Sequence, residues 1–376
     1  MSSPFIYEDP LEPPEALADR TDELALLRDR IGDARNSRLV GARRYGKTSV
    51  LKAALAAAGR DGFVPIYVNF LGVLSATDVA ERIEQAYREQ LDGGLKRWFA
   101  GVVSTLRPRV KAAPGGVGVE VAPATQSPGL LDRLALPRRL HERHGRQCAI
   151  AFDEFQEVLR AGGALAGTIR SELEQHGNAA AYLFSGSHPG MMRDLFSDRR
   201  HAFFAQAKPV DLPRLPAEEL AEYIGARFER GRRDPGDALE LLLARADGHP
   251  QRSMLLAHHL YESTKPGRSA GSEEWVAAFT GAAHDADPEV QAAWDSWTNS
   301  ERRLMAAISE RTTPLQGRAA RERYGISKTG SNKVTIERLE RSGHLVADET
   351  TATGWRILDP LLELWLANGR TWPPPN

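Results

Sequence analysis

Short apolar runs alternate with amphipathic stretches over roughly the first two hundred residues of the chain. The clearest runs are residues 64–70 (VPIYVNF), 148–152 (CAIAF) and 179–184 (AAAYLF), and residues 38–40 form a shorter one. Such runs are typical of strands that are buried on both faces. The stretches between them carry apolar residues at three- and four-residue spacing, which predicts helices. The alternation predicts an α/β fold with a doubly wound, mostly parallel sheet.

Two segments in the first half of the chain do not fit the alternation of apolar strands and amphipathic helices. Residues 1–14 are rich in proline and predict an extended arm. Residues 107–129 are rich in proline, glycine and valine and contain the alternating run VGVEV, which predicts a loop or a small hairpin between helices. The predicted helices of this part of the chain are residues 17–31, 50–58, 77–91, 130–144 and 165–176.

Strand patterns stop near residue 215. Residues 216–229, 238–246 and 251–263 have helical periods separated by Gly, Pro and Asp, and residues 273–297 predict a longer helix with three tryptophans. These changes of pattern predict three domains. They are a nucleotide-binding sheet domain at 1–212, an all-helical lid with a linker helix at 213–297, and a C-terminal domain at 298–376.

The C-terminal domain has the pattern of three helices followed by two strands. Thr298 and Glu301 form a T-x-x-E capping box that opens the first helix, and glycines 325 and 343 end the second and third. The segment HLVADETTATGWRIL then predicts a hairpin. Three helices and a hairpin are the winged-helix variant of the helix-turn-helix motif.

Composition narrows the functional classes. The chain has 49 Lys plus Arg against 50 Asp plus Glu, a net charge of −1, so any grip on nucleic acid must come from a local basic face. A single cysteine excludes a disulfide framework and a Cys-built zinc site. No apolar run approaches the roughly 18 residues that cross a bilayer. The N-terminus is acidic, unlike a signal or transit peptide, so we expect a cytoplasmic protein without membrane partners.

A phosphate-binding loop follows the first short strand. Residues 41–49 (GARRYGKTS) match G-x-x-x-x-G-K-[ST], in which backbone N–H groups surround phosphate oxygens. The Lys47 ammonium would bridge the β- and γ-phosphates and the Thr48 hydroxyl would bind Mg²⁺. A chance match on a surface loop is the alternative, and Arg43 and Arg44 could instead face solvent. The predicted phosphate-binding residues are Gly41, Ala42, Arg43, Arg44, Tyr45, Gly46, Lys47, Thr48 and Ser49.

Acidic residues stand at the end of the most apolar strand. Asp153 and Glu154 follow CAIAF directly. Asp153 would hold Mg²⁺, and Glu154 would accept the proton of the attacking water. Alone, two acids after a strand are more often a cap for the next helix. The next strand ends in FSGS, where Ser185 and Ser187 could touch the γ-phosphate or the water, or could simply form a turn.

The strings GARRYGKTS, FDEFQ, FSGS and GHP, followed by the C-terminal pattern, resemble the archaeal-type ATPase family of P-loop proteins, which borders on the AAA+ and STAND classes. The family is similar in layout to the origin-recognition ATPases, and the resemblance runs from about Phe5 to Leu366. It implies a five-stranded sheet, a helical lid after about residue 213, and ATP with Mg²⁺ as the ligand. The absence of an NKxD-type guanine-binding motif agrees with ATP.

The resemblance also assigns residues outside the phosphate loop. It places Arg20, in ADRTDEL, near the adenine, although the same string suits a helix N-terminus. It places His249 and Pro250 of GHP at the nucleotide, although such a tripeptide is otherwise only a turn before a helix.

Two departures argue against a fast ring-forming motor. Arg252 stands one place from the position of the arginine that such motors carry in the lid, and Gln206 stands near the position of their inter-subunit arginine. Arg199 and Arg200 lie upstream and could substitute for it, or could be solvated surface residues.

The third helix of the C-terminal domain is a candidate nucleic-acid contact. Residues 298–343 hold ten basic and five acidic groups, a net charge of +5. Lys328, Ser331, Asn332 and Lys333 open the helix that would meet DNA. A winged helix that docks a protein, and a merely solvated face, are the alternatives.

Together the patterns predict a slowly hydrolysing ATPase switch whose winged helix binds double-stranded DNA. A nucleotide-gated adaptor that binds a protein is the alternative, and a DNA-remodelling motor is a third class. ATP and ADP are the expected small partners, and a protein partner or self-association stays open.

Overall fold

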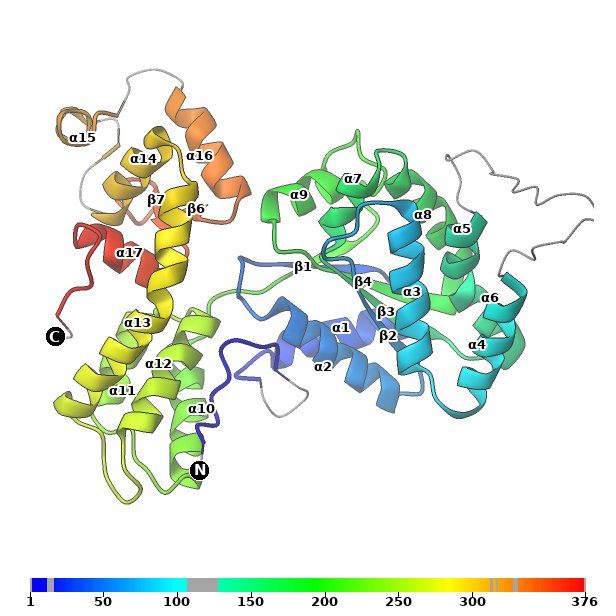
Figure 1. The fold of residues 1–376 in the computed structure, drawn as a ribbon, viewed down its shortest axis with the longest axis horizontal. Helices are drawn as coiled ribbons and strands as arrows, with labels where there is room; N and C mark the ends of the chain where they lie inside the picture. Colours follow the sequence, from blue (N-terminus) through cyan, green and yellow to red (C-terminus); the bar gives the residue numbers. More distant parts are fainter. Residues whose placement is uncertain are drawn as a thin grey trace, which may run out of the picture.

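The computed structural model describes residues 2–11, 17–106, 128–311, 314–315, 317–326 and 331–374. Within them, a five-stranded parallel sheet in the order β2-β3-β4-β1-β5 forms the centre of the sheet domain (Figure 1). Its strands are β1 Ser37–Val40, β2 Val64–Asn69, β3 Cys148–Asp153, β4 Ala180–Phe184 and β5 Lys208–Asp211. The α/β fold with a parallel sheet is confirmed.

Helices cover both faces of this sheet, as the apolar pattern of β3 requires. Ala149 and Ala151 face one core, which α1 and α2 complete, whereas Ile150 and Phe152 face a larger core on the opposite side. The helices of this domain are α1 Thr21–Gly32, α2 Lys47–Arg60, α3 Ala76–Gln90, α4 Gly93–Leu106, α5 Pro128–Leu134, α6 Leu136–His144, α7 Val158–Ala161, α8 Leu165–Leu173 and α9 Pro189–Ser197, with 3₁₀ turns at Phe155–Glu157 and Glu174–Ala179.

Several elements differ from the sequence expectation. Helix α1 begins at Thr21 rather than 17, because Asp19 and Arg20 have positive φ values of 50° and 94°. The single helix expected over 130–144 is two, α5 and α6, and α5 already begins at Pro128. The VGVEV run lies outside the described residues. Pattern reasoning overlooked α4, α9 and β5, of which β5 is a short edge strand with a single buried residue.

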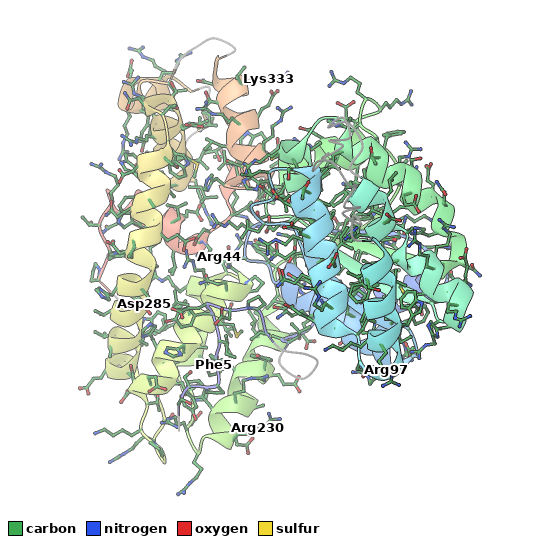
Figure 2. All side chains as sticks on the ribbon, turned by 45° about the vertical axis from the view of Figure 1, so that its right-hand side comes forward. Phe5, Arg44, Arg97, Arg230, Asp285 and Lys333 are labelled. Atoms are coloured by element: carbon green, nitrogen blue, oxygen red, sulfur yellow. The ribbon has the colours of Figure 1, made fainter. Side chains whose placement is uncertain are left out.

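Four helices form the lid and its linker. They are α10 Ala217–Arg230, α11 Ala238–Ala246, α12 Pro250–Ser263 and α13 Ser272–Ser296. Their core contains Phe228, Leu256 and Trp275, and it also takes in Phe5 from the N-terminal arm. Figure 2 shows Phe5 among the lid helices, where its ring lies 5.8 Å from that of Phe228. The arm is therefore attached to the lid by a buried aromatic side chain.

The C-terminal domain has the three helices and two strands that the sequence pattern predicts, and one more helix follows them. It consists of α14 Asn299–Ser309, α15 Arg318–Tyr324, α16 Ser331–Arg341, β6 Leu345–Ala347, β7 Trp355–Ile357 and α17 Pro360–Ala367. Both halves of the capping box between Thr298 and Glu301 are present. None of the helices in the described ranges is long and apolar enough to span a bilayer.

The C-terminal domain contacts the sheet domain through α16. Figure 1 shows the C-terminal end of α16 beside α9. Arg193 of α9 pairs with Glu340 of α16 at 3.0 Å. A Cβ on Gly190 would lie 2.6 Å from the Arg341 side chain, so α9 can approach α16 closely only with glycine at that position.

Candidate functional site

A cavity of about 890 Å³ lies where the carboxyl ends of β1 and β3 meet the lid. Ligands of open α/β sheets bind at this edge, and the volume suits a nucleotide-sized molecule. Its walls come from the N-terminal arm, the phosphate loop, the end of β3, α12 and α13. The predicted site residues that line it are Arg20, Arg43, Arg44, Tyr45, Gly46, Lys47, Thr48, Ser49, Asp153, Glu154, Ser187 and Pro250.

The phosphate loop is wrapped around the Lys47 ammonium. Gly46 has a φ of 79°, a conformation that glycine adopts without strain, and α2 begins at the next residue. Lys47 Nζ donates to the carbonyl oxygens of Gly41 at 3.0 Å and Ala42 at 2.6 Å. Burial lowers the pKa of Lys47 to about 8, while the carboxylates of Asp153 and Glu154 act in the opposite direction. A phosphate in this loop would stabilise the charged form of Lys47.

The Asp153 carboxylate accepts hydrogen bonds from three hydroxyl groups that lie in separate segments of the chain. Its Oδ2 accepts hydrogen bonds from Thr48 Oγ1 at 2.7 Å and from Tyr67 Oη at 2.8 Å, and its Oδ1 accepts one from Ser185. The parallel register of β2 and β3 places Asn69 opposite Asp153, so Tyr67 lies two residues before that pair on β2. The Asp153 side chain is only 3% exposed, and burial followed by the Asp153 charge raises the pKa of Tyr67.

The oxygen atoms of Thr48 and Asp153 fit a Mg²⁺ ion. Mg²⁺ takes oxygen ligands and is usually held by one or two protein groups together with phosphate oxygens and waters. The described residues contain no group of three or more His, Cys, Asp or Glu side chains that could hold a metal by themselves. A metal at this site would therefore depend on nucleotide phosphates as well as on Thr48 and Asp153.

Glu154 adopts a left-handed backbone conformation, with φ 52° and ψ 38°. Such a conformation costs a non-glycine residue free energy and is often found at functional sites. Its Oε2 accepts hydrogen bonds from Ser187 Oγ at 2.7 Å and Ser187 N at 3.3 Å. Asp153 Oδ1 in turn accepts from the Glu154 N–H at 3.0 Å. Glu154 and Ser187 both line the cavity, so the ends of β3 and β4 meet there.

Four of the residues predicted for the nucleotide site do not line the cavity. Gly41 and Ala42 contribute carbonyls to Lys47, and Ser185 is fully buried beneath Asp153. His249 is the N-cap of α12, where its Nδ1 accepts from the Arg252 N–H at 3.3 Å. Ser185 and His249 therefore make hydrogen bonds to other protein groups and do not face the cavity.

The Arg20 side chain lies between the sheet domain and the lid. It is 3% exposed, although it lines the cavity. Its guanidinium donates to the Pro213 carbonyl at 2.7 Å and to Glu23 at 3.0 Å.

An ion-pair network lies in the wall of the cavity that the phosphate loop and the lid form. Arg252 Nη2 lies 2.7 Å from Glu289 Oε2 on α13, and Arg252 Nε lies 3.0 Å from Asp359 Oδ1 at the start of α17. Arg44 of the phosphate loop pairs with the same oxygen of Glu289. Burial would raise the pKa of Asp359, but Arg252 more than offsets it and holds that pKa well below its usual range. Sequence reasoning overlooked Glu289 and Asp359, because no motif marks them.

The remaining predicted residues lie away from the cavity. Arg200 is exposed and pairs with Asp198 at 2.6 Å, and Arg199 lies over the Phe204 ring. Lys333 is exposed near the start of α16 (Figure 2), and Asn332 is half-buried. Lys328 and the side chain of Ser331 lie outside the described residues.

The fold is shared with solved ATPase structures. The Walker-type ATPase PABY2304 of Pyrococcus abyssi superposes with a TM-score of 0.71 at 16% identity, covering 96% of this chain and 98% of that one. The ORC2 protein of Aeropyrum pernix, in its ADPNP-ADP complexes, gives a TM-score of 0.57 at 19% identity, covering 96% of each chain. No protein-family model and no curated protein matches the sequence. The chain thus has the fold of the ORC-like P-loop ATPases, as its motifs implied.

Proposed function

We propose that this protein binds ATP with Mg²⁺ in the cavity, hydrolyses it slowly, and uses the nucleotide state to control its C-terminal domain. One observation carries the proposal: Lys47, Thr48, Asp153, Glu154 and Ser187 lie together around one cavity of nucleotide size. The Aeropyrum pernix ORC2 protein, which shares the fold, was solved in ADPNP-ADP complexes, and this supports a nucleotide as the ligand.

Each residue has a distinct chemical role in this proposal. Lys47 and the loop N–H groups bind the β- and γ-phosphates. Thr48 and Asp153 would hold Mg²⁺, which when bound neutralises charge on the phosphate oxygens. Glu154 accepts the proton of the attacking water. Ser187 keeps the Glu154 carboxylate in place, since it donates twice to Oε2.

The switch in this proposal operates through Glu289. In the present structure, Glu289 pairs with both Arg44 and Arg252, which both line the cavity. A triphosphate offers these guanidinium groups a stronger anionic partner than one carboxylate. Arg252 is also paired with Asp359 at the start of α17, so a change at Arg252 would reach the C-terminal domain. ATP binding would thereby compete with contacts between the lid and the C-terminal domain.

Double-stranded DNA is the proposed partner of the C-terminal domain. The basic side chains of the C-terminal domain are partly neutralised, because several of them pair with nearby acidic side chains. These pairs are Arg311–Glu363, Arg318–Glu322, Arg323–Glu310 and Arg338–Glu301. In the described part of the domain, Arg303, Arg321, Lys333 and Arg341 have no ion pair, and they could contact phosphates.

A protein-binding adaptor is the second candidate, and one observation favours it. Val334 is 67% exposed on α16, on the helix that would enter the DNA groove. An exposed apolar residue suits a protein contact better than a phosphate contact. A protein partner and DNA therefore make different demands on the same helix.

ATP turnover with and without mixed-sequence duplex DNA tests the proposal. We expect slow Mg²⁺-dependent release of phosphate from the wild type and retained ATP binding without turnover in Glu154→Gln. Glu81→Gln, an exposed residue of α3, is the matched control and should keep the wild-type rate. Absence of ATP binding by the wild type would exclude the proposed function. Turnover that DNA does not change would favour the adaptor.

A further inference from the structure

Gln156 is a fully buried amide next to the hydrolysis site. It lies in the 3₁₀ turn that follows Glu154, and its side chain is 0% exposed. Its Nε2 donates to Glu154 Oε2 at 2.5 Å and lies 3.4 Å from Glu157 Oε1. It also lies 3.5 Å from Nδ1 of His188. The amide nitrogen thus faces two carboxylates and a histidine.

These surroundings determine the orientation of the amide. If it were flipped, its carbonyl oxygen would face the carboxylates of Glu154 and Glu157, and acceptors repel one another. In the observed orientation, Gln156 Oε1 is buried and has no hydrogen-bond partner among the described residues. An unpaired buried carbonyl costs stability. The favourable interaction of the buried Gln156 amide is therefore the hydrogen bond that its nitrogen donates to Glu154.

Gly186 leaves the space that the Gln156 amide occupies. A Cβ at position 186 would lie 2.0 Å from Gln156 Oε1 and 2.8 Å from Met192 Cγ, far inside contact distance. The φ of Gly186 is not positive, so its role is to leave space and not to permit a turn. Backbone hydrogen bonds join the same two segments, from Phe155 N to Ser185 O and from Ser185 N to Phe152 O. The segment after β4 (FSGS) therefore packs closely against the segment after β3 (DEFQ).

We infer that Gln156 is a positioning residue for Glu154, which it holds together with Ser187 toward the water-attack position in the cavity. Three donors, from the Gln156 amide, the Ser187 hydroxyl and the Ser187 N–H, converge on Glu154 Oε2. Glu154 Oε1 is left to accept the proton of the water. This inference rests on the proposed ATPase function.

Replacing Gln156 with Met tests the inference, because Met has similar volume and no amide donor. We expect the rate of phosphate release at saturating ATP to fall about tenfold to a hundredfold, the effect of one hydrogen bond to a charged group. The dissociation constant for Mg-ATP, measured by calorimetry, should stay within twofold of the wild type. Gln156→Glu places a third carboxylate beside Glu154 and should lower the rate further. Gln175→Met, on the exposed turn before β4, is the matched control and should leave both quantities unchanged.

A double-mutant cycle that combines Gln156→Met with Ser187→Ala distinguishes a positioning role of Gln156 from a packing role. Because both residues act on the same oxygen, the double variant should lose less than the product of the two single losses. Losses that simply multiply, a wild-type rate in Gln156→Met, or an ATP affinity that falls with the rate would each overturn the inference. If the wild type itself releases no phosphate, the proposed function fails first, and the inference fails with it. Gln156→Asn, with melting temperatures for every variant, replaces Gln156→Met if that variant does not fold.

Discussion

Arg44 of the phosphate loop and Glu289 of α13 form an ion pair at the cavity, although 245 residues separate them in the chain. The same Glu289 oxygen also pairs with Arg252 of α12. One carboxylate therefore connects the phosphate loop, the lid and, through Asp359, the C-terminal domain. Figure 2 shows Arg44 between the sheet domain and the column of lid and C-terminal helices. A ligand that competes for Arg44 would act on all three parts.

Glu289→Gln should raise the affinity for ATP about threefold to fivefold. The variant removes the carboxylate charge that pairs with Arg44 and Arg252, although Arg252 keeps its pair with Asp359. The half-exposed pair with Arg44 is worth at most about 1 kcal/mol. Calorimetric titration with Mg-ATP measures the change. Glu273→Gln, exposed near the start of the same helix, is the control. Weaker binding in Glu289→Gln would mean that Glu289 supports the site and does not compete with nucleotide.

Lys47→Ala should weaken ATP binding at least tenfold, about 1.4 kcal/mol. The substitution removes the buried ammonium that the phosphate loop surrounds and that would bind the β- and γ-phosphates. The same calorimetric titration applies. Lys52→Ala removes an ammonium from α2 away from the cavity and should bind ATP as the wild type does. Equal affinities in Lys47→Ala and the wild type would exclude this loop as the phosphate site.

Asp153→Asn should reduce the effect of Mg²⁺ on ATP affinity about tenfold. Asn keeps the shape of the side chain but loses the charge that would attract the cation, and it disturbs the hydroxyl donors of Thr48, Tyr67 and Ser185. Titrations with Mg²⁺ and with EDTA give the effect for each variant. Asp211→Asn, exposed at the end of β5, serves as the comparison. An unchanged Mg²⁺ effect would remove Asp153 from the metal site.

Lys333→Glu in the full chain should weaken binding to duplex DNA and reduce its salt dependence by about one phosphate contact. The wild-type dissociation constant for mixed sequence should be on the order of 10⁻⁴–10⁻⁶ M. Fluorescence anisotropy at two salt concentrations measures both quantities, and Lys265→Glu, exposed after α12, controls for net charge. A wild type that ignores DNA at low salt would favour the adaptor function.

Folding stability should fall as the pH falls below about 6.5. Burial and the nearby Arg138 lower the pKa of His176 to about 4, and the ring is hydrogen-bonded to Tyr182 at 2.6 Å. Between these pH values the unfolded chain binds more protons than the folded chain, so lowering the pH favours unfolding. The contribution of His176 between pH 7.5 and 5 is about 2 kcal/mol.

Urea unfolding of the wild type and of His176→Gln at both pH values checks this contribution. The variant should lose less stability on acidification than the wild type does. His201→Gln, a half-exposed histidine, should keep the wild-type pH dependence. Equal losses in His176→Gln and the wild type would contradict the prediction.

The sequence by itself determined the features that are encoded in short stretches of chain. The apolar runs of β2, β3 and β4 predicted a parallel sheet, since burial on both faces leaves a continuous apolar string. The motif at residues 41–49 predicted the phosphate loop, because its glycines and lysine act within one turn. The capping box at Thr298 was equally local, and the structure contains it.

The tertiary structure decided which distant side chains meet at the site. Strand register brought Tyr67 to Asp153 across 86 residues, and lid packing brought Arg252 to Glu289 and Asp359. The tertiary structure also buried Ser185 fully beneath Asp153, whereas Ser187 lines the cavity. No residue spacing in the sequence marked Gln156 as a residue of the site. Its importance depends on a partner at Glu154 and on the space at Gly186, and burial and distance are properties that only the folded chain has.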